Sequence, residues 1–281
     1  MLGLCAHGVR TVKKIAIIPT LFTLGNAVCG FASIALASKI DGGAATKVYF
    51  VYGAAFIFLA MVFDSLDGYV ARLSKTASEF GGQLDSLCDA ISFGAAPAFL
   101  LLRLGQDWEA TTVRQTIAII AALYTMCAVL RLARFNVENS PDPASHKRFK
   151  GLPSPAAAGC VASLAILRGN LDQNWEALNG ALGGALMVWA PLGTLLVALL
   201  MVSRVPYPHL TKQFLRGRRH FSHLMQVVLA ILVLALLREL ALVVVFWGYA
   251  LTILVRYMLV RAFRRNAMAS QTHGLEDVPH R

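Results

Sequence analysis

Charged side chains are scarce in this sequence. They make up 15% of the 281 residues, whereas hydrophobic side chains make up 57%. Soluble domains carry about 25% charged residues, and the mean hydropathy of this chain is +0.61. This composition excludes an ordinary soluble protein and indicates a protein with several membrane spans.

Cysteine is also scarce, and it follows no pattern typical of metal binding or disulfide bonding. The five cysteines are scattered, their number is odd, and no Cys-x-x-Cys occurs. A disulfide framework and a zinc site are therefore disfavoured. We interpret the cysteines as small buried side chains.

Acidic residues are fewer than basic ones, and the net charge is +11. In a soluble protein such a charge can indicate nucleic-acid binding, but here the basic residues flank apolar runs. We interpret them as determinants of membrane topology and as contacts to anionic membrane lipids, and we expect no nucleic-acid partner.

Eight apolar segments predict an all-α integral membrane protein with about eight transmembrane helices. They are 15–38, 48–73, 83–104, 112–135, 153–167, 178–202, 223–237 and 240–261. Only Arg238-Glu239 separates the last two, which predicts a hairpin, with one long bent helix as the alternative. The predicted parts are a juxtamembrane segment (1–14), a six-helix membrane core (15–202), a basic loop (203–222), a C-terminal transmembrane hairpin (223–262) and a tail (263–281).

The distribution of basic residues predicts the orientation of this layout. With the N-terminus in the cytoplasm, all but six of the 26 lysines and arginines lie on the cytoplasmic side. The six exceptions are Lys39, Lys47, Arg103, Arg114, Arg168 and Arg238. Because cytoplasmic loops carry the excess of Lys and Arg, both termini are expected inside the cell.

Four aspartates lie at the cytoplasmic ends of the second and third predicted spans. Asp64 and Asp67 are spaced i, i+3, whereas Gly81, Asp85 and Asp89 are spaced i, i+4, i+8, so each set lines one helix face. Carboxylates at membrane level are costly and mark functional sites. Four converging carboxylates predict a site for Mg²⁺, Mn²⁺ or Ca²⁺ and for phosphoryl chemistry. A buried ion-pair network is the structural alternative.

These residues also match a known signature. The pattern is Asp64-x2-Asp67-Gly68-x2-Ala71-Arg72-x8-Gly81-x3-Asp85-x3-Asp89. It resembles, without a mismatch, the signature of the CDP-alcohol phosphatidyltransferase family, and the resemblance extends roughly over residues 18–202. It implies an enzyme in which an alcohol attacks the lipid-side phosphorus of a CDP-activated lipid and CMP leaves.

The resemblance also implies roles for individual residues. Asp64, Asp67, Asp85 and Asp89 would form the metal site for Mg²⁺ or Mn²⁺, with two ions expected, and Asp89 would also be the general base. Residues expected to bind CDP-diacylglycerol are Asn26, Gly68, Ala71, Arg72, Ser78 and Gly81.

Three further stretches resemble the phosphatidylserine synthase branch of the family, at residues 19–26, 131–136 and 149–157. The first departs slightly, because Thr20 stands where that branch commonly has Asn. The resemblance implies transfer of the phosphatidyl group from CDP-diacylglycerol to L-serine. A multi-pass protein of the cell inner membrane, with its active site on the cytoplasmic side, is expected.

Serine carries a carboxylate that needs a cationic partner. The candidate serine-binding residues are Arg131, Arg134, Asn136 and Lys150. The same cations would suit glycerol 3-phosphate, so only the branch resemblance favours serine. A carboxylate-based ion or proton transporter is a remote alternative, because such sites often lie between repeats near the bilayer midplane. Glycines among alanines near residues 180–184 suggest close helix packing and a possible homodimer.

Overall fold

The structure is a computed structural model that describes residues 17–40, 45–73, 79–105, 110–138, 151–174, 179–203, 205 and 240–259. All regular structure within these ranges is helical. The helices are α1 (Ile17–Ala37), α2 (Thr46–Leu73), α3 (Glu79–Asp89), the π-helical turn η1 (Ala90–Ala95), α4 (Ala96–Leu104), α5 (Thr111–Glu138), α6 (Ser154–Asn174), α7 (Asn179–Val202) and the C-terminal helix Leu240–Leu259.

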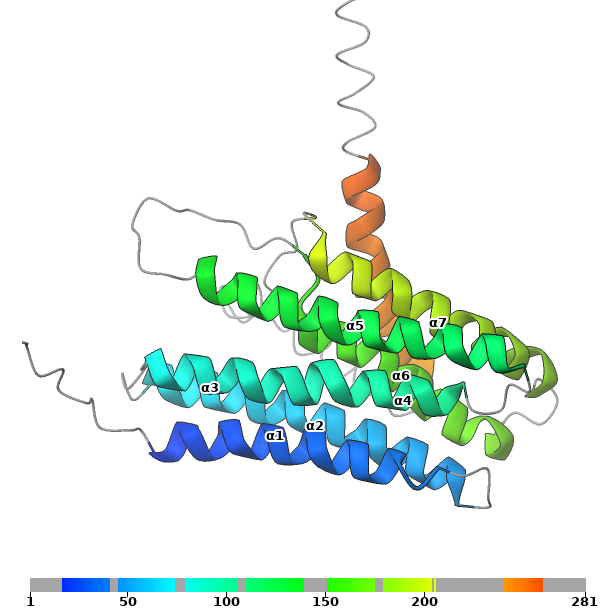
Figure 1. Ribbon diagram of the computed structural model, residues 1–281, viewed down its shortest axis with the longest axis horizontal. Helices are drawn as coiled ribbons and strands as arrows, with labels where there is room; N and C mark the ends of the chain where they lie inside the picture. Colours follow the sequence, from blue (N-terminus) through cyan, green and yellow to red (C-terminus); the bar gives the residue numbers. More distant parts are fainter. Residues whose placement is uncertain are drawn as a thin grey trace, which may run out of the picture.

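The helices up to α7 form a bundle with roughly parallel axes (Figure 1). The elements α3, η1 and α4 follow one another as a single rod, so the bundle has six rods. In Figure 1 the rod of α3 to α4 lies between α1 and α5, while α2 packs directly against α6. These six rods lie within residues 15–202, the range of the predicted membrane core.

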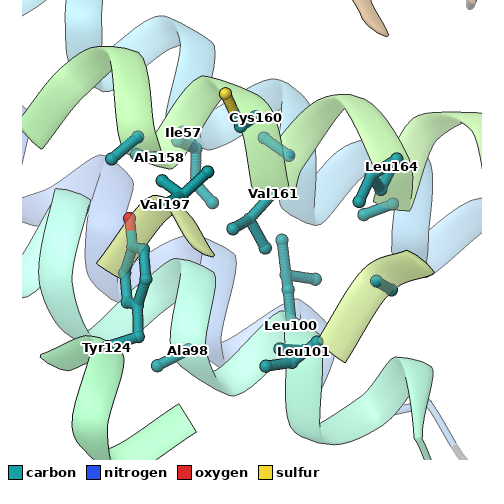
Figure 2. Packing of buried hydrophobic residues seen from close by; sticks show 14 of the residues in the cluster. Ile57, Ala98, Leu100, Leu101, Tyr124, Ala158, Cys160, Val161, Leu164 and Val197 are labelled. Atoms are coloured by element: carbon teal, nitrogen blue, oxygen red, sulfur yellow. The ribbon is translucent and has the colours of Figure 1, made fainter. Parts of the chain in front are cut away.

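The core of the bundle is apolar. Ile57 of α2, Leu100 of α4, Val161 of α6 and Val197 of α7 are all fully buried and lie close together (Figure 2). Tyr124 of α5 is buried beside them, and it brings a polar hydroxyl into the core. This packing fixes the rotation of each helix about its own axis. It therefore also fixes the direction in which the polar side chains at the end of the bundle point.

The outer surface of the bundle is also apolar. On α1, Val28 is 65% and Phe31 is 68% exposed. Large apolar side chains that face outward are costly in water and suited to lipid. Six described helices are long and apolar enough to cross a membrane, and they lie at Ile17–Ala37, Thr46–Ala71, Phe80–Leu104, Thr111–Val137, Gly183–Val202 and Leu240–Leu259. The chain is a multi-pass membrane protein.

The predicted count of eight spans is not confirmed. Segment 153–167 forms α6, which continues to Asn174 but is not among the six apolar helices. Segment 223–237 and the basic loop 206–222 lie outside the described residues. The helix Leu240–Leu259 runs steeply across the bundle in Figure 1 (orange), and the predicted hairpin is likewise not confirmed.

The C-terminal helix is held at its crossing point by two aromatic residues. A Cβ placed on Gly159 of α6 or Gly193 of α7 would collide with Phe246 or Trp247, respectively. The Trp247 indole N–H donates to the Cys160 carbonyl at 3.1 Å. Small residues on the bundle therefore admit the bulky residues of this helix.

The entry into α6 is fixed by the backbone around Gly151. Gly151 has a φ of 96°, and its N–H donates to the Val205 carbonyl at 2.8 Å, while the Leu152 N–H donates to the Leu200 carbonyl at 3.0 Å. These bonds tie the start of α6 to the end of α7 and so place Ser154.

Replacing Gly151 with alanine is expected to destabilise the protein. A Cβ at this position would approach the Met201 carbonyl oxygen to 2.2 Å, and the left-handed backbone costs a residue with a Cβ roughly 1–2 kcal/mol. Thermal unfolding in detergent should show a lower midpoint for Gly151→Ala. Gly184→Ala is the matched control, because nothing lies within 4 Å of a Cβ there. Equal midpoints for the two variants would contradict this account.

Candidate active site

Three of the four predicted aspartates converge at one end of the bundle. Asp64 and Asp67 lie near the end of α2, and Asp85 lies in α3. One carboxylate oxygen from each lies within 4.8 Å of the others. The i, i+3 spacing on α2 turns both of its acids toward α3, as the sequence predicted.

This trio has the chemistry of a divalent-cation site. Asp67 is 5% exposed, and within the described part of the chain its Oδ2 atom and the Oδ1 atom of Asp85 are buried without a hydrogen-bond partner. Unpaired carboxylate oxygens that repel one another in a poorly solvated place need a cation. Their oxygen-only donor set suits a hard ion such as Mg²⁺ or Mn²⁺, so the residues fit a bound metal.

Asp89 lies one turn beyond Asp85 and has a separate partner. It is 7% exposed, and its Oδ1 atom accepts a hydrogen bond of 2.8 Å from the Asn26 side-chain amide on α1. The Asn26 Oδ1 atom is buried without a partner. The structure thus brings Asn26 to the aspartates, although 63 positions separate it from Asp89.

The glycines of the signature lie beside the acids. Gly68 follows Asp67, and no atom of the described residues lies within 4 Å of a Cβ placed on it, so the described part of the chain leaves space next to the trio. Gly81 begins the acidic face of α3, and Ala71 is half-buried in α2. Arg72 belongs to α2, but its side chain lies outside the description, as does the whole of Ser78.

Arg131 is a basic residue beside the acids. It is half-buried on α5 and lies within electrostatic range of Asp89 and Asp64. Its Nη1 atom donates to the Ser154 hydroxyl at 2.6 Å. A hydrogen-bonded guanidinium beside the carboxylates is positioned to hold an anionic group of a substrate.

Asn136 also reaches the acidic helix. Its Oδ1 atom accepts a hydrogen bond of 3.0 Å from the hydroxyl of Ser86, the neighbour of Asp85, and its amide is 3.5 Å from the Gln83 Oε1 atom. Arg134 is half-buried on the same helix. Lys150 lies outside the described residues.

The sequence did not reveal several neighbours of these groups. Ser154 and Ser86 are ordinary serines in the sequence, and only the packing of α6 and α3 against α5 shows their contacts. Tyr249 of the C-terminal helix lies within electrostatic range of Arg131. The Pro-Ser-Pro of residues 153–155 was the one local signal for Ser154.

Comparison with known proteins agrees with this geometry. The sequence model of the CDP-alcohol phosphatidyltransferase family matches residues 16–201. A CDP-diacylglycerol–serine O-phosphatidyltransferase of Methanocaldococcus jannaschii is 33% identical over 199 residues, which cover 70% of this chain and 77% of the relative.

Two further relatives show comparable similarity. A CDP-diacylglycerol–serine O-phosphatidyltransferase of Helicobacter pylori is 33% identical over 203 residues, 72% of this chain and 76% of the relative. An archaetidylserine synthase of Methanothermobacter thermautotrophicus is 32% identical over 201 residues, 71% of this chain and 72% of the relative. The matched region contains all four aspartates, Asn26 and Arg131. The chain belongs to the CDP-alcohol phosphatidyltransferase family.

Proposed function

We propose that this protein transfers the phosphatidyl group from CDP-diacylglycerol to L-serine and so produces phosphatidylserine and CMP. The observation that carries this proposal is the convergence of Asp64, Asp67 and Asp85 beside Asp89 and Arg131. The names of the relatives support both substrates. The protein is a transferase of phospholipid synthesis.

The donor side of the site is formed by the acids of α2 and α3. Asp64, Asp67, Asp85 and Asp89 would hold Mg²⁺ or Mn²⁺, two ions in our proposal, which offset the negative charge of a diphosphate. The open space beside Gly68 lets a phosphate approach the backbone of α2. Asn26, Ala71, Arg72, Ser78 and Gly81 complete the proposed contacts to CDP-diacylglycerol.

The acceptor side centres on Asp89. The serine hydroxyl oxygen forms a bond to the lipid-side phosphorus, the bond from that phosphorus to the CMP oxygen breaks, and the hydroxyl proton goes to the Asp89 carboxylate. The Asn26 amide donates to Oδ1 of Asp89 and so orients the carboxylate. A carboxylate within reach of the attacking hydroxyl is a suitable general base.

Arg131 is the best-supported partner for the serine carboxylate. Its guanidinium is anchored by Ser154 and lies near the proposed base, which would place the serine hydroxyl toward Asp89. Arg134, Asn136 and Lys150 are proposed as further contacts to serine. A planar fork of donors matches a carboxylate better than an ammonium does.

The position of the site supports a cytoplasmic location. The ends of α2 and α5 and the start of α3 meet at one end of the bundle (Figure 1). The excess of lysines and arginines belongs to the loops and tails predicted on that side. We infer that both termini and the active site face the cytoplasm at the cell inner membrane, where soluble serine is available.

The acceptor can be identified with purified protein in lipid vesicles that contain CDP-diacylglycerol and Mg²⁺ or Mn²⁺. We expect CMP release that depends on added L-serine, with phosphatidylserine as the lipid product. Glycerol 3-phosphate is the comparison, because its phosphate could use the same arginine. CMP release with glycerol 3-phosphate and none with serine would refute the proposed acceptor.

Asparagine substitutions are expected to separate metal binding from proton transfer. Asp64→Asn and Asp85→Asn each remove a ligand charge, so Mn²⁺ binding measured by electron paramagnetic resonance should weaken, and CMP release should fall more than about 100-fold. Asp89→Asn should lower CMP release by about 100-fold or more while Mn²⁺ binding falls less.

Ser65→Ala is the control for these variants. Ser65 neighbours Asp64 but is exposed, and its hydroxyl bonds to the Met61 carbonyl within α2. The turnover and Mn²⁺ binding of the Ser65→Ala variant should match those of the wild type. Wild-type turnover by Asp89→Asn would exclude Asp89 as the base.

Replacing Arg131 with lysine is expected to weaken serine binding. The charge remains, but the guanidinium fork and its bond to Ser154 are lost, so the KM for serine should rise on the order of 10-fold. The KM for CDP-diacylglycerol should change less. Arg114→Lys is the control, because Arg114 is exposed near the opposite end of α5. Equal rises in both KM values would argue against a specific contact to serine.

A further inference from the structure

The rod that carries Asp85 and Asp89 is not a regular α-helix throughout. Directly after Asp89, residues Ala90–Ala95 form the π-helical turn η1. At its end, the Ala96 N–H donates to the Ile91 carbonyl, five residues earlier instead of four. Turns of this kind are rare in proteins and are concentrated at functional sites.

Pro97 gives a local cause for the widened turn. In a regular α-helix the amide of residue 97 would donate to the carbonyl of Phe93, but proline has no N–H, and its ring crowds that carbonyl. A turn with one additional residue relieves the crowding. Because Pro97 has no N–H, the buried Phe93 carbonyl lacks the donor that a regular α-helix would give it.

The donor comes from a different helix. The Tyr124 hydroxyl on α5 donates to the Phe93 carbonyl at 3.0 Å. Phe93 and Tyr124 are both fully buried, and Figure 2 shows Tyr124 surrounded by apolar side chains of several helices. Water is therefore a poor substitute for this hydroxyl. The neighbouring Thr125 hydroxyl lies 3.5 Å from the Gly94 carbonyl and 3.1 Å from the Ala121 carbonyl of its own helix.

Helix α1 packs against η1 as well. A Cβ on Gly30 would lie 2.6 Å from the Cα atom of Ser92, so the two backbones are in close contact there. One turn before Gly30, Asn26 donates to Asp89. The widened turn is thus held by α1 through Gly30 and by α5 through Tyr124.

The extra residue changes how the two halves of the rod face their surroundings. Each residue of an α-helix turns the chain by about 100°, so one additional residue rotates α4 relative to α3 by roughly that angle. Asp85 can then face the acids of α2, and Asp89 can face Asn26 of α1, while Leu100 and Leu101 are buried in the core. The direction of Asp89 consequently depends on the widened turn.

We propose that Tyr124 is a positioning residue for the transfer reaction, because its hydroxyl holds the widened turn after Asp89 through the Phe93 carbonyl. The proposal rests on the proposed function in that it takes Asp89 as the general base. Tyr124 itself contacts no substrate in this account. It acts by keeping the Asp89 carboxylate in line with the attacking hydroxyl.

The first test is Tyr124→Phe in the full-length protein, reconstituted in lipid vesicles with CDP-diacylglycerol and serine. The ring remains to fill the core, but the donor is lost. We expect kcat to fall about 10-fold or more, because small misplacements of a reacting group are costly, while both KM values stay within about 2-fold of the wild type. Thr116→Val is the matched control on α5, since the Thr116 hydroxyl is exposed and bonds to the Thr112 carbonyl of its own helix.

The second test is Pro97→Ala, which separates position from stability. The new N–H can satisfy the Phe93 carbonyl within the helix, so the thermal midpoint should stay equal or rise. The turn can then close to a regular α-turn, so kcat should nevertheless fall about 10-fold or more. If Tyr124 merely stabilised the fold, the kcat values of the two variants would rise and fall with their thermal midpoints.

Two results would overturn the proposal. One is a wild-type kcat in Tyr124→Phe. The other is a wild-type kcat in Pro97→Ala together with a loss of activity in Tyr124→Phe that is fully explained by a smaller fraction of folded Tyr124→Phe protein. If the wild type uses glycerol 3-phosphate instead of serine, the proposed acceptor is wrong, and the same comparison of kcat values with that acceptor still decides the role of Tyr124.

Discussion

The mutual repulsion of carboxylates at one end of an apolar helix bundle is the constraint on which the rest of this structure depends. Oxygens of Asp64, Asp67 and Asp85 lie within 4.8 Å of one another, and two of the buried oxygens have no protein donor. In a poorly solvated place such charges are tolerated only with compensating cations. Apolar packing elsewhere in the bundle must hold α2 and α3 together against this repulsion, and the extensive core of the bundle does so.

The protein surrounds the acids with few but well-defined polar contacts. Asn26 bonds to Asp89 from α1, and Arg131 is fixed by Ser154 between α5 and α6. The ordering of Ser154 depends in turn on the backbone bonds of Gly151 and Leu152 to the end of α7. The proposed metal-binding face on α2 and α3 and the proposed anion-binding face on α5 and α6 therefore meet at the same end of the bundle, which suits phosphatidyl transfer between two charged substrates.

The spans were predictable because a membrane imposes length and apolar composition on a helix, yet the helix ends were not. The third apolar segment was predicted to begin at residue 83, whereas α3 begins at Glu79. The fifth was predicted to end at residue 167, whereas α6 continues through Arg168 to Asn174. Hydropathy marks the part of a helix that suits lipid, and backbone hydrogen bonding continues into the polar residues beyond it.

The sequence by itself determined that four aspartates share two helix faces, because the spacing of residues along a helix is local geometry. It also determined the family, through residues between Asp64 and Asp89. Only the tertiary structure decided that Asn26 bonds to Asp89 across 63 positions, that Arg131 pairs with Ser154, and that Tyr124 bonds to the turn after Asp89. These contacts depend on how neighbouring helices are rotated and how deeply they pack, and no local pattern encodes either quantity.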